Sequence, residues 1–182
     1  MILFETERLN VRTWNPEADA PQAFEFYGDL RVMRWLGAVP KAFDSVEQVR
    51  ARLEQHAAKF IEKPDEGLFP VVRKSDDKVI GGVIFRELPD SDGNGTGDVE
   101  IGWHFAVEAW GQGYATEAAR GLISWGAMRH PDLTEVWAIA YPENVKSLAV
   151  MERLGMIPVG MTNKYYGIEA MSYRLDLPLK NQ

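Results

Sequence analysis

The chain has 182 residues, of which 46% are hydrophobic and 26% charged, and this length suits one domain with a full core. Its formal net charge of -7 at pH 7 argues against nucleic-acid binding, because contacts to a phosphate backbone need clustered Lys and Arg. The same charge would favour an amine or another cationic substrate.

Cysteine is absent, which excludes disulfides, thiolate metal sites and a cysteine nucleophile. The three histidines are scattered at positions 56, 104 and 130, so we expect no metal. No window approaches the roughly 18 apolar residues of a membrane span, and the first charge comes at the fifth residue, unlike a signal peptide. We therefore expect a cytoplasmic protein without membrane or nucleic-acid partners.

The first third of the chain indicates one strand followed by helices. Residues 6–14 have alternating character and predict a strand, and 15–29 and 30–37 give short helical patterns. Asn15 followed by Pro16 is typical of a helix N-cap and first helical residue. The clearest helix is 44–63, where apolar residues recur at spacings of three and four up to Pro64.

The rest alternates strands with helices. Two β-rich runs, 68–74 and 78–88, predict a hairpin, and a third strand follows over 98–107. A helical period begins at Gly113, a strand covers 134–141, and a helix over 144–155 stops at Gly155 before two final strands. We expect one mixed α/β domain over residues 1–182.

Small residues precede the helix that begins at Gly113. Gly111, Gly113 and Ala115 leave little side chain where a strand turns into a helix, and such a turn exposes backbone N–H groups that attract phosphate. The residues after Gly113 are not the Lys-Ser/Thr of a P-loop. A Rossmann fold is disfavoured because hairpin-connected strands precede the turn and no acidic residue ends the next strand.

Three successive motifs, "EIGWHF", "WGQGYATEA" and "NVKSLAVMERLGM", resemble those of the GNAT superfamily of acyl-CoA N-acyltransferases, in order and in separation. The initial "TERLNVR" resembles the branch of ribosomal-protein alanine acetyltransferases. The resemblance covers Thr6 to about Leu177. It implies a central, mostly antiparallel twisted sheet flanked by helices, with a splayed strand pair at the acetyl-CoA site, and acetyl-CoA as co-substrate without a metal.

The resemblance also implies the coenzyme site. The pyrophosphate would lie on backbone amides of the turn from Trp110 to Ala115, and the pantetheine arm would run along the preceding strand end. Trp110 stands where the family carries Gln or Arg, so we expect Gln112 to supply that donor. The implied coenzyme-binding residues are Phe105, Ala106, Val107, Gly111, Gln112, Gly113, Tyr114, Ala115, Thr116 and Asn144.

Amine acetylation needs a base and a donor for the leaving thiolate. Glu100 lies in the strand that the resemblance places beside the acyl group, and alternation puts it on one face with Gly102 and His104. We expect Glu100 to be the base, while a solvated or ion-paired strand carboxylate is the alternative. His104 could share this role or be a hydrogen-bonded structural histidine.

The thiolate donor is less evident. Many superfamily members carry a tyrosine at the position of Met151, which has no proton to donate. The alanine acetyltransferase branch has N-x-x-S at the start of this helix, as do Asn144 and Ser147 here. We expect Ser147 to donate to the thiolate and Asn144 to bind pantetheine; helix capping alone is the competing interpretation.

These features predict an acetyl-CoA-dependent N-acetyltransferase in which a primary amine, including a protein N-terminal amine, attacks the thioester directly. Acetylation of a small amine, such as an antibiotic or a polyamine, is the first alternative. A non-catalytic acyl-CoA-binding module is the second. The sequence leaves the acceptor and the oligomeric state open, a homodimer included.

Overall fold

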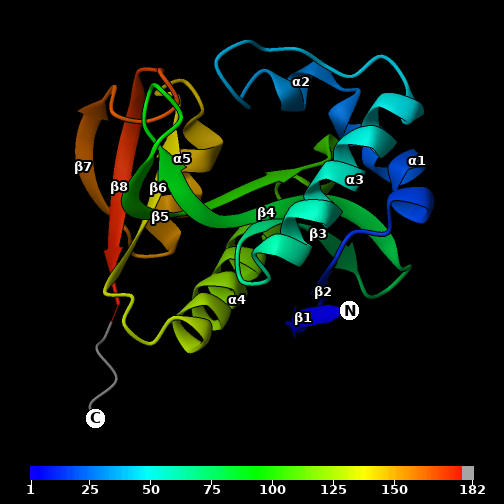
Figure 1. The fold of residues 1–182 in the computed structure, drawn as a ribbon, viewed down its shortest axis with the longest axis horizontal. Coiled ribbons are helices and arrows are strands. Elements are labelled where there is room, and N and C mark those ends of the chain that lie inside the picture. The colour runs from blue at the N-terminus through cyan, green and yellow to red at the C-terminus, as the bar shows by residue number, and fades with distance from the viewer. Residues whose placement is uncertain (178–182) are drawn as a thin grey trace.

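An eight-stranded sheet forms the centre of the computed structural model, which describes residues 1–177 (Figure 1). Its order is β1-β2-β3-β4-β5-β6-β8-β7, and neighbouring strands are antiparallel except β5 and β6. This confirms the mixed α/β fold with a mostly antiparallel sheet. The strands are β1 (Ile2–Glu5), β2 (Leu9–Arg12), β3 (Gly67–Arg73), β4 (Lys78–Pro89), β5 (Gly95–Phe105), β6 (Glu135–Ala140), β7 (Ile157–Thr162) and β8 (Ala170–Asp176).

The parallel strands β5 and β6 meet at a single residue pair. Glu100 is in register with Trp137, and no other pair joins these strands within the described residues. On its other edge β5 stays paired with β4 as far as Phe105, so the interruption affects one edge only. The backbone beyond Glu100 thus parts from β6, as expected for the splayed pair.

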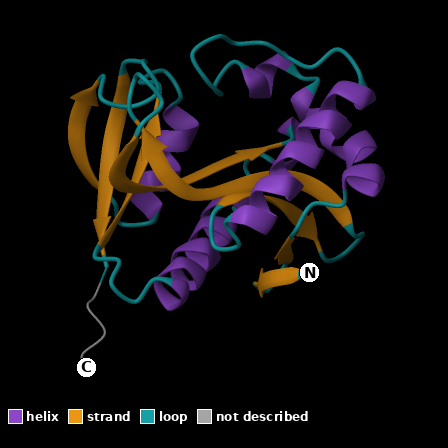
Figure 2. Cartoon of the chain, viewed as in Figure 1, coloured by secondary structure: helices purple, strands orange, loops and turns teal. Residues whose placement is uncertain are grey.

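The helices cover both faces of the sheet (Figure 2). Neighbouring strand residues face opposite sides: Val71 and Ile80 pack in the cluster that contains α4, whereas Val72 and Val79 pack with α1 and α3. The helices are α1 (Pro16–Tyr27), α2 (Leu30–Met33), α3 (Val46–Glu62), α4 (Tyr114–Arg129) and α5 (Val145–Arg153), with a 3₁₀ turn at Val107–Ala109.

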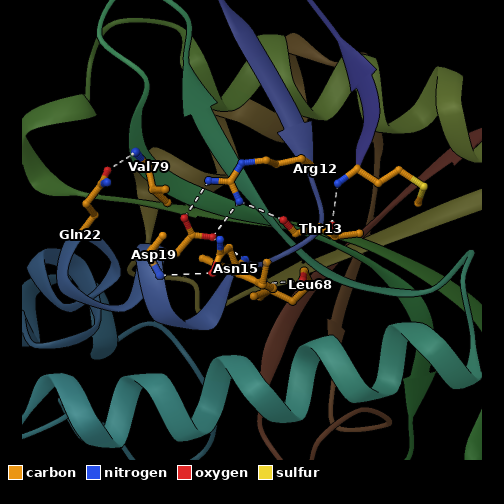
Figure 3. Close-up of polar contacts among 10 residues, drawn as sticks. Arg12, Thr13, Asn15, Asp19, Gln22, Leu68 and Val79 are labelled. Atoms are coloured by element: carbon orange, nitrogen blue, oxygen red, sulfur yellow. Dashed lines mark hydrogen bonds and ion pairs between the residues drawn. The ribbon is translucent and has the colours of Figure 1, made fainter.

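Polar contacts fasten α1 to the sheet (Figure 3). Asp19, only 2% exposed, accepts two 2.7 Å hydrogen bonds from the Arg12 guanidinium of β2 and one from the Asn15 backbone N–H. Gln22 accepts a 2.8 Å bond from the Val79 N–H of β4. Because buried polar groups are costly unless paired, these bonds fix the position of α1 against the sheet.

Helix starts follow the sequence signals. The Asn15 side chain accepts from the Ala18 N–H with Pro16 as first helical residue, which confirms the predicted cap. Ser45 caps α3 in the same way by accepting from Gln48.

Two predicted strand extents are wrong. The strand expected over 6–14 is only β2, because the Thr6 N–H donates to the Leu9 carbonyl and forms a turn that leads back to the unforeseen β1. The strand expected over 98–107 ends at Phe105, where the chain enters the 3₁₀ turn. Within residues 1–177 no helix is long and apolar enough to cross a membrane, and no group of three or more His, Cys, Asp or Glu is arranged to hold a metal.

Candidate active site

One cleft of about 2370 Å³ joins the turn before α4 to the splayed end of β5. Tyr141, just after β6, donates its hydroxyl hydrogen to the Gly37 carbonyl at 2.9 Å, and so links two loops that line the cleft. Of the predicted site residues, the cleft is lined by Glu100, Phe105, Gly111, Gly113, Tyr114, Ala115, Thr116, Asn144 and Ser147. Ala106, Val107 and Gln112 are not among its lining residues.

The turn before α4 presents uncapped backbone amides. Gly111 and Gly113 have φ of 74° and 81°, in the left-handed region that favours glycine, and no side chain caps the N-terminus of α4. A Cβ on Gly111 would meet no atom within 4 Å, and one on Gly113 would meet only the Arg8 guanidinium at 3.4 Å. Close helix–strand packing therefore does not account for these glycines; the positive φ of the turn does, and it leaves the start of α4 without a side-chain cap.

The strand end that should hold pantetheine is already engaged. The Trp110 indole N–H donates to the Phe105 carbonyl at 2.8 Å, and the Ala106 N–H donates to Ile80 at 2.9 Å. The carbonyls of Ala106 and Val107 accept the bonds of the 3₁₀ turn. Each of these carbonyls keeps a second lone pair for a strand-like contact, and of the three residues only Phe105 lines the cleft.

Gln112, the expected donor, lies outside the cleft lining. Its side-chain amide donates to the Glu108 carbonyl at 2.6 Å, which ties it to its own turn and away from the cleft. The sequence reasoning missed Lys146. Its ammonium lies 4.2 Å from the Trp110 ring centroid. This cation–π contact places a positive charge beside the turn.

Arg8 is a second residue that the sequence reasoning missed. It donates to the Gln112 carbonyl at 3.0 Å and to the Glu117 carboxylate at 2.6 Å, and its guanidinium covers the Tyr114 ring at 4.5 Å. Burial would raise the pKa of Glu117, but hydrogen bonds from Thr6 and Arg8 outweigh it and lower the pKa. Arg8 therefore holds the turn against the first turn of α4.

Glu100 lies at the centre of a polar triad. Its carboxylate is 7% exposed, accepts a short hydrogen bond from the Tyr166 hydroxyl and lies 3.4 Å from the Arg86 guanidinium. Arg86 also donates to the Tyr166 oxygen at 2.8 Å. Burial, followed by the charge of Glu100, raises the pKa of Tyr166, so this phenol stays a donor. The carboxylate is ion-paired as the competing interpretation required, yet it also lines the cleft.

Tyr166 comes from an irregular loop between β7 and β8. Its φ is 55°, an uncommon conformation for a residue with a side chain. Such local strain persists where the surrounding contacts hold it, and here they are the bonds to Glu100 and Arg86. The loop thereby orients the carboxylate.

His104 is a neutral histidine at working pH. It is 7% exposed, and its Nε2 lies 3.1 Å from the Tyr27 hydroxyl while Nδ1 has no partner among the described residues. Burial lowers its pKa to about 4, so it would be a weak proton acceptor. This environment favours the structural interpretation over a share in the base role.

The start of α5 brings Asn144 and Ser147 to the cleft. Asn144 caps the helix by accepting from the Ser147 N–H at 3.3 Å, so its side-chain oxygen is occupied and its amide N–H groups remain as donors. Ser147 is partly exposed and is one of the lining residues. Met151 is 1% exposed and packs in the main core, where the larger ring of a tyrosine would need room.

The chain is similar to known acetyltransferases in sequence and in fold. Residues 8–157 match the family model described as an acetyltransferase (GNAT) domain. The chain is 29% identical over 159 residues to the N-acetyltransferase YnaD of Bacillus subtilis, which covers 87% of this chain and 85% of that protein. An acetyltransferase structure from Agrobacterium tumefaciens is 26% identical, covers 94% and 92% of the two chains, and has a TM-score of 0.72.

A further solved structure shares the fold and contains the coenzyme. It is the ribosomal L7/L12 α-N-protein acetyltransferase RimL in complex with coenzyme A, 15% identical, with a TM-score of 0.76 over 97% of this chain and 98% of that one. The family match covers most of the chain, and the cleft has the amide-lined turn and the carboxylate described above. The chain therefore belongs to the GNAT family of N-acetyltransferases, enzymes that use acetyl-CoA.

Proposed function

We propose that this enzyme transfers an acetyl group from acetyl-CoA to a primary amine by direct attack, and that a peptide N-terminal amine is its first candidate acceptor. The pyrophosphate binds the amides from Gly111 to Thr116, and the thioester lies in the splay between β5 and β6. Glu100 is the base, and Ser147 donates a hydrogen bond to the leaving thiolate.

The proposed reaction begins with the neutral amine. Its nitrogen forms a bond to the thioester carbon, the carbon–sulfur bond breaks, and the amine proton passes to Glu100 directly or through one water. The sulfur leaves as a thiolate that accepts a bond from Ser147 and takes up a proton. Arg86 and Tyr166 hold the Glu100 carboxylate throughout, so that it is oriented before the amine arrives.

One observation carries the proposal: the uncapped amides of the α4 turn and the buried carboxylate of Glu100 open into the same cleft. An anion site alone would fit a binding module. Glu100 lies at the one residue pair that joins β5 to β6, where the strands begin to part, and its carboxylate gives the cleft a means to remove a proton.

The N-terminal amine is the first acceptor to test because RimL, which has this fold, is described as an α-N-protein acetyltransferase. Small amines, such as antibiotics or polyamines, are the second class. The test is release of coenzyme A thiol from acetyl-CoA in the presence of peptides, an aminoglycoside and a polyamine. We expect thiol release with a free-amine peptide and none with the same peptide blocked at its N-terminus. Acetyl-CoA binding without turnover on any amine would instead identify a non-catalytic module.

A further inference from the structure

The part of the cleft lining that comes from the first third of the chain carries several cations, in a protein of net charge -7. We call the lining residues between positions 27 and 56 the acceptor wall; they come from the end of α1, α2, the following loop and α3. None of these lining residues is Asp or Glu. The wall therefore departs from the acidic surface expected for a cationic substrate.

Three cations of the acceptor wall are free of carboxylate partners. Arg34, Lys41 and Arg52 line the cleft, and no Asp or Glu of residues 1–177 lies within ion-pair distance of them. Two other cations of the cleft, Arg86 and Arg8, are paired with Glu100 and Glu117, whereas Arg120, Lys146 and Arg153 of α4 and α5 also lack a carboxylate partner within residues 1–177. The protein walls of a cleft have a low dielectric constant, so they concentrate the electric field of such unpaired charges inside it.

Arg52 projects from the cleft-facing side of α3. Gln48, Arg52 and Gln55 are spaced by four and three residues, which places them on one helix face, and all three line the cleft. Arg52 donates to the Gln55 side-chain oxygen at 3.3 Å. Amide groups thus flank a guanidinium whose planar fork suits a carboxylate.

The positive charge on this face of α3 acts on a residue that also feels the charge of Arg86, the partner of Glu100. His56, one helical turn after Arg52, has its pKa lowered to about 3 by burial and then by the charges of Arg52 and Arg86. Arg86 is the cation that pairs with the proposed base. A second positive charge on an acceptor would therefore be repelled close to the reaction centre, and a negative one attracted.

We propose that the acceptor carries a carboxylate close to its reactive amine and that Arg52, supported by Arg34 and Lys41, binds it. The proposal rests on the function proposed above and narrows its substrate class. A peptide with an acidic residue next to its N-terminus and a free acidic amino acid both offer this chemistry. Polyamines and aminoglycosides, which carry several positive charges, do not.

The test uses matched acceptors. Two peptides differ only by Asp or Asn at the second position. Free glutamate and its diamide, in which both carboxylates are replaced by amides, form a second pair that separates a peptide source from a small-molecule source. Turnover is measured by thiol release with saturating acetyl-CoA for the wild type, Arg52→Gln, Arg52→Glu and the control Lys59→Gln. Lys59 is an exposed residue of α3 outside the cleft lining, so its variant removes the same charge from the same helix.

We expect the wild type to prefer the acidic member of one pair at least tenfold in kcat/KM, and the preference to weaken with added salt. It should fall below threefold in Arg52→Gln, reverse in Arg52→Glu and persist in Lys59→Gln. Equal use of acidic and neutral acceptors by the wild type, or a preference for a polyamine, would overturn the proposal.

Binding separates this inference from the proposed reaction. Calorimetric titration of the two peptides into the protein with coenzyme A bound reports charge recognition without turnover. Selective binding of the acidic peptide, lost in Arg52→Gln, without acetylation would support the charge site and contradict the proposed reaction. Acetylation of both peptides with equal affinity would support the reaction and overturn the charge site.

Discussion

Replacement of Glu100 by Gln removes the proposed base and keeps the shape of the triad. The amide oxygen of Gln can still accept from Tyr166 and Arg86, the two groups that hold the carboxylate. What is lost is the capacity to take up a proton. A positioned general base is worth about 10² to 10⁴ in rate, so we expect kcat to fall by that factor.

Asp98→Asn is a matched control for this change. Asp98 lies two residues before Glu100 in β5, pairs with Lys164 at 2.5 Å and accepts from the Tyr165 hydroxyl at 2.7 Å, but it does not line the cleft. It therefore repeats the carboxylate, cation and phenol of the Glu100 triad away from the chemistry. We expect Asp98→Asn to keep kcat within about threefold of wild type.

The assay is thiol release with a peptide amine, and acetyl-CoA binding is measured separately by calorimetry. Coenzyme affinity should change little in Glu100→Gln, because the phosphate turn is untouched. Activity of this variant should rise with pH as the N-terminal amine, with a pKa near 8, loses its proton unaided. Wild-type turnover of Glu100→Gln between about pH 6 and pH 9 would refute the assignment of Glu100 as base.

Four further outcomes follow from the same structure. Acetyl-CoA at a hundredfold excess over Kd should stabilise the wild type by about 2.7 kcal/mol, and Gly113→Asp should abolish most of this stabilisation. The control Gly93→Asp, at a position with a similar positive φ in an exposed turn, should keep it. An unchanged ligand-induced shift of the melting temperature in folded Gly113→Asp would contradict the phosphate site. Ser147→Ala should lower kcat about tenfold, and full turnover where chemistry limits the rate would leave the serine a helix-start residue only. Tyr166→Phe removes one hydrogen bond to Glu100, so kcat should fall by up to about tenfold while KM for acetyl-CoA stays unchanged. A rise in that KM alone would argue against the role of Tyr166 in positioning Glu100. The His104 pKa of about 4 lies below the ordinary 6.5, so the unfolded chain binds a proton at higher pH than the folded protein does. The free energy of unfolding should therefore fall by about 3 kcal/mol as pH falls from 6.5 to 4. His104→Phe should flatten the pH dependence of the urea midpoint only in part, because His56 acts in the same direction, and an unchanged slope would contradict the buried neutral histidine.

The turn before α4 could be predicted because its signal is local. Gly111 and Gly113 need positive φ, and the helical period begins where they end, so sequence spacing carries the geometry. Glu100 is a candidate base because the resemblance to a family places its strand beside the acyl group, and the residue does line the cleft. The pairing of β4 with β5 continues without a register shift from Glu100 to Phe105, so side chains alternate regularly between the two faces of the sheet over this stretch.

The partners of Glu100 could not be predicted because they come from distant parts of the chain. Arg86 is brought beside Glu100 by the register of β4 against β5, and Tyr166 comes from a loop that has no periodic pattern. The orientation of Gln112 depends on a single hydrogen bond to the Glu108 carbonyl, which residue type alone does not specify. The free cations of the acceptor wall likewise emerge only when α2 and α3 are placed over the cleft.

The most direct test of the enzyme's proposed reaction is to locate the transferred group. A peptide with both an N-terminal amine and a lysine is incubated with acetyl-CoA and the wild-type enzyme, and fragment masses then show which nitrogen is acetylated. We predict one acetyl group on the N-terminal nitrogen, and almost none in parallel reactions with Glu100→Gln. Acetyl transfer that is equally fast with Glu100→Gln, or acetylation of the lysine alone, would contradict N-terminal acetylation by a Glu100 base.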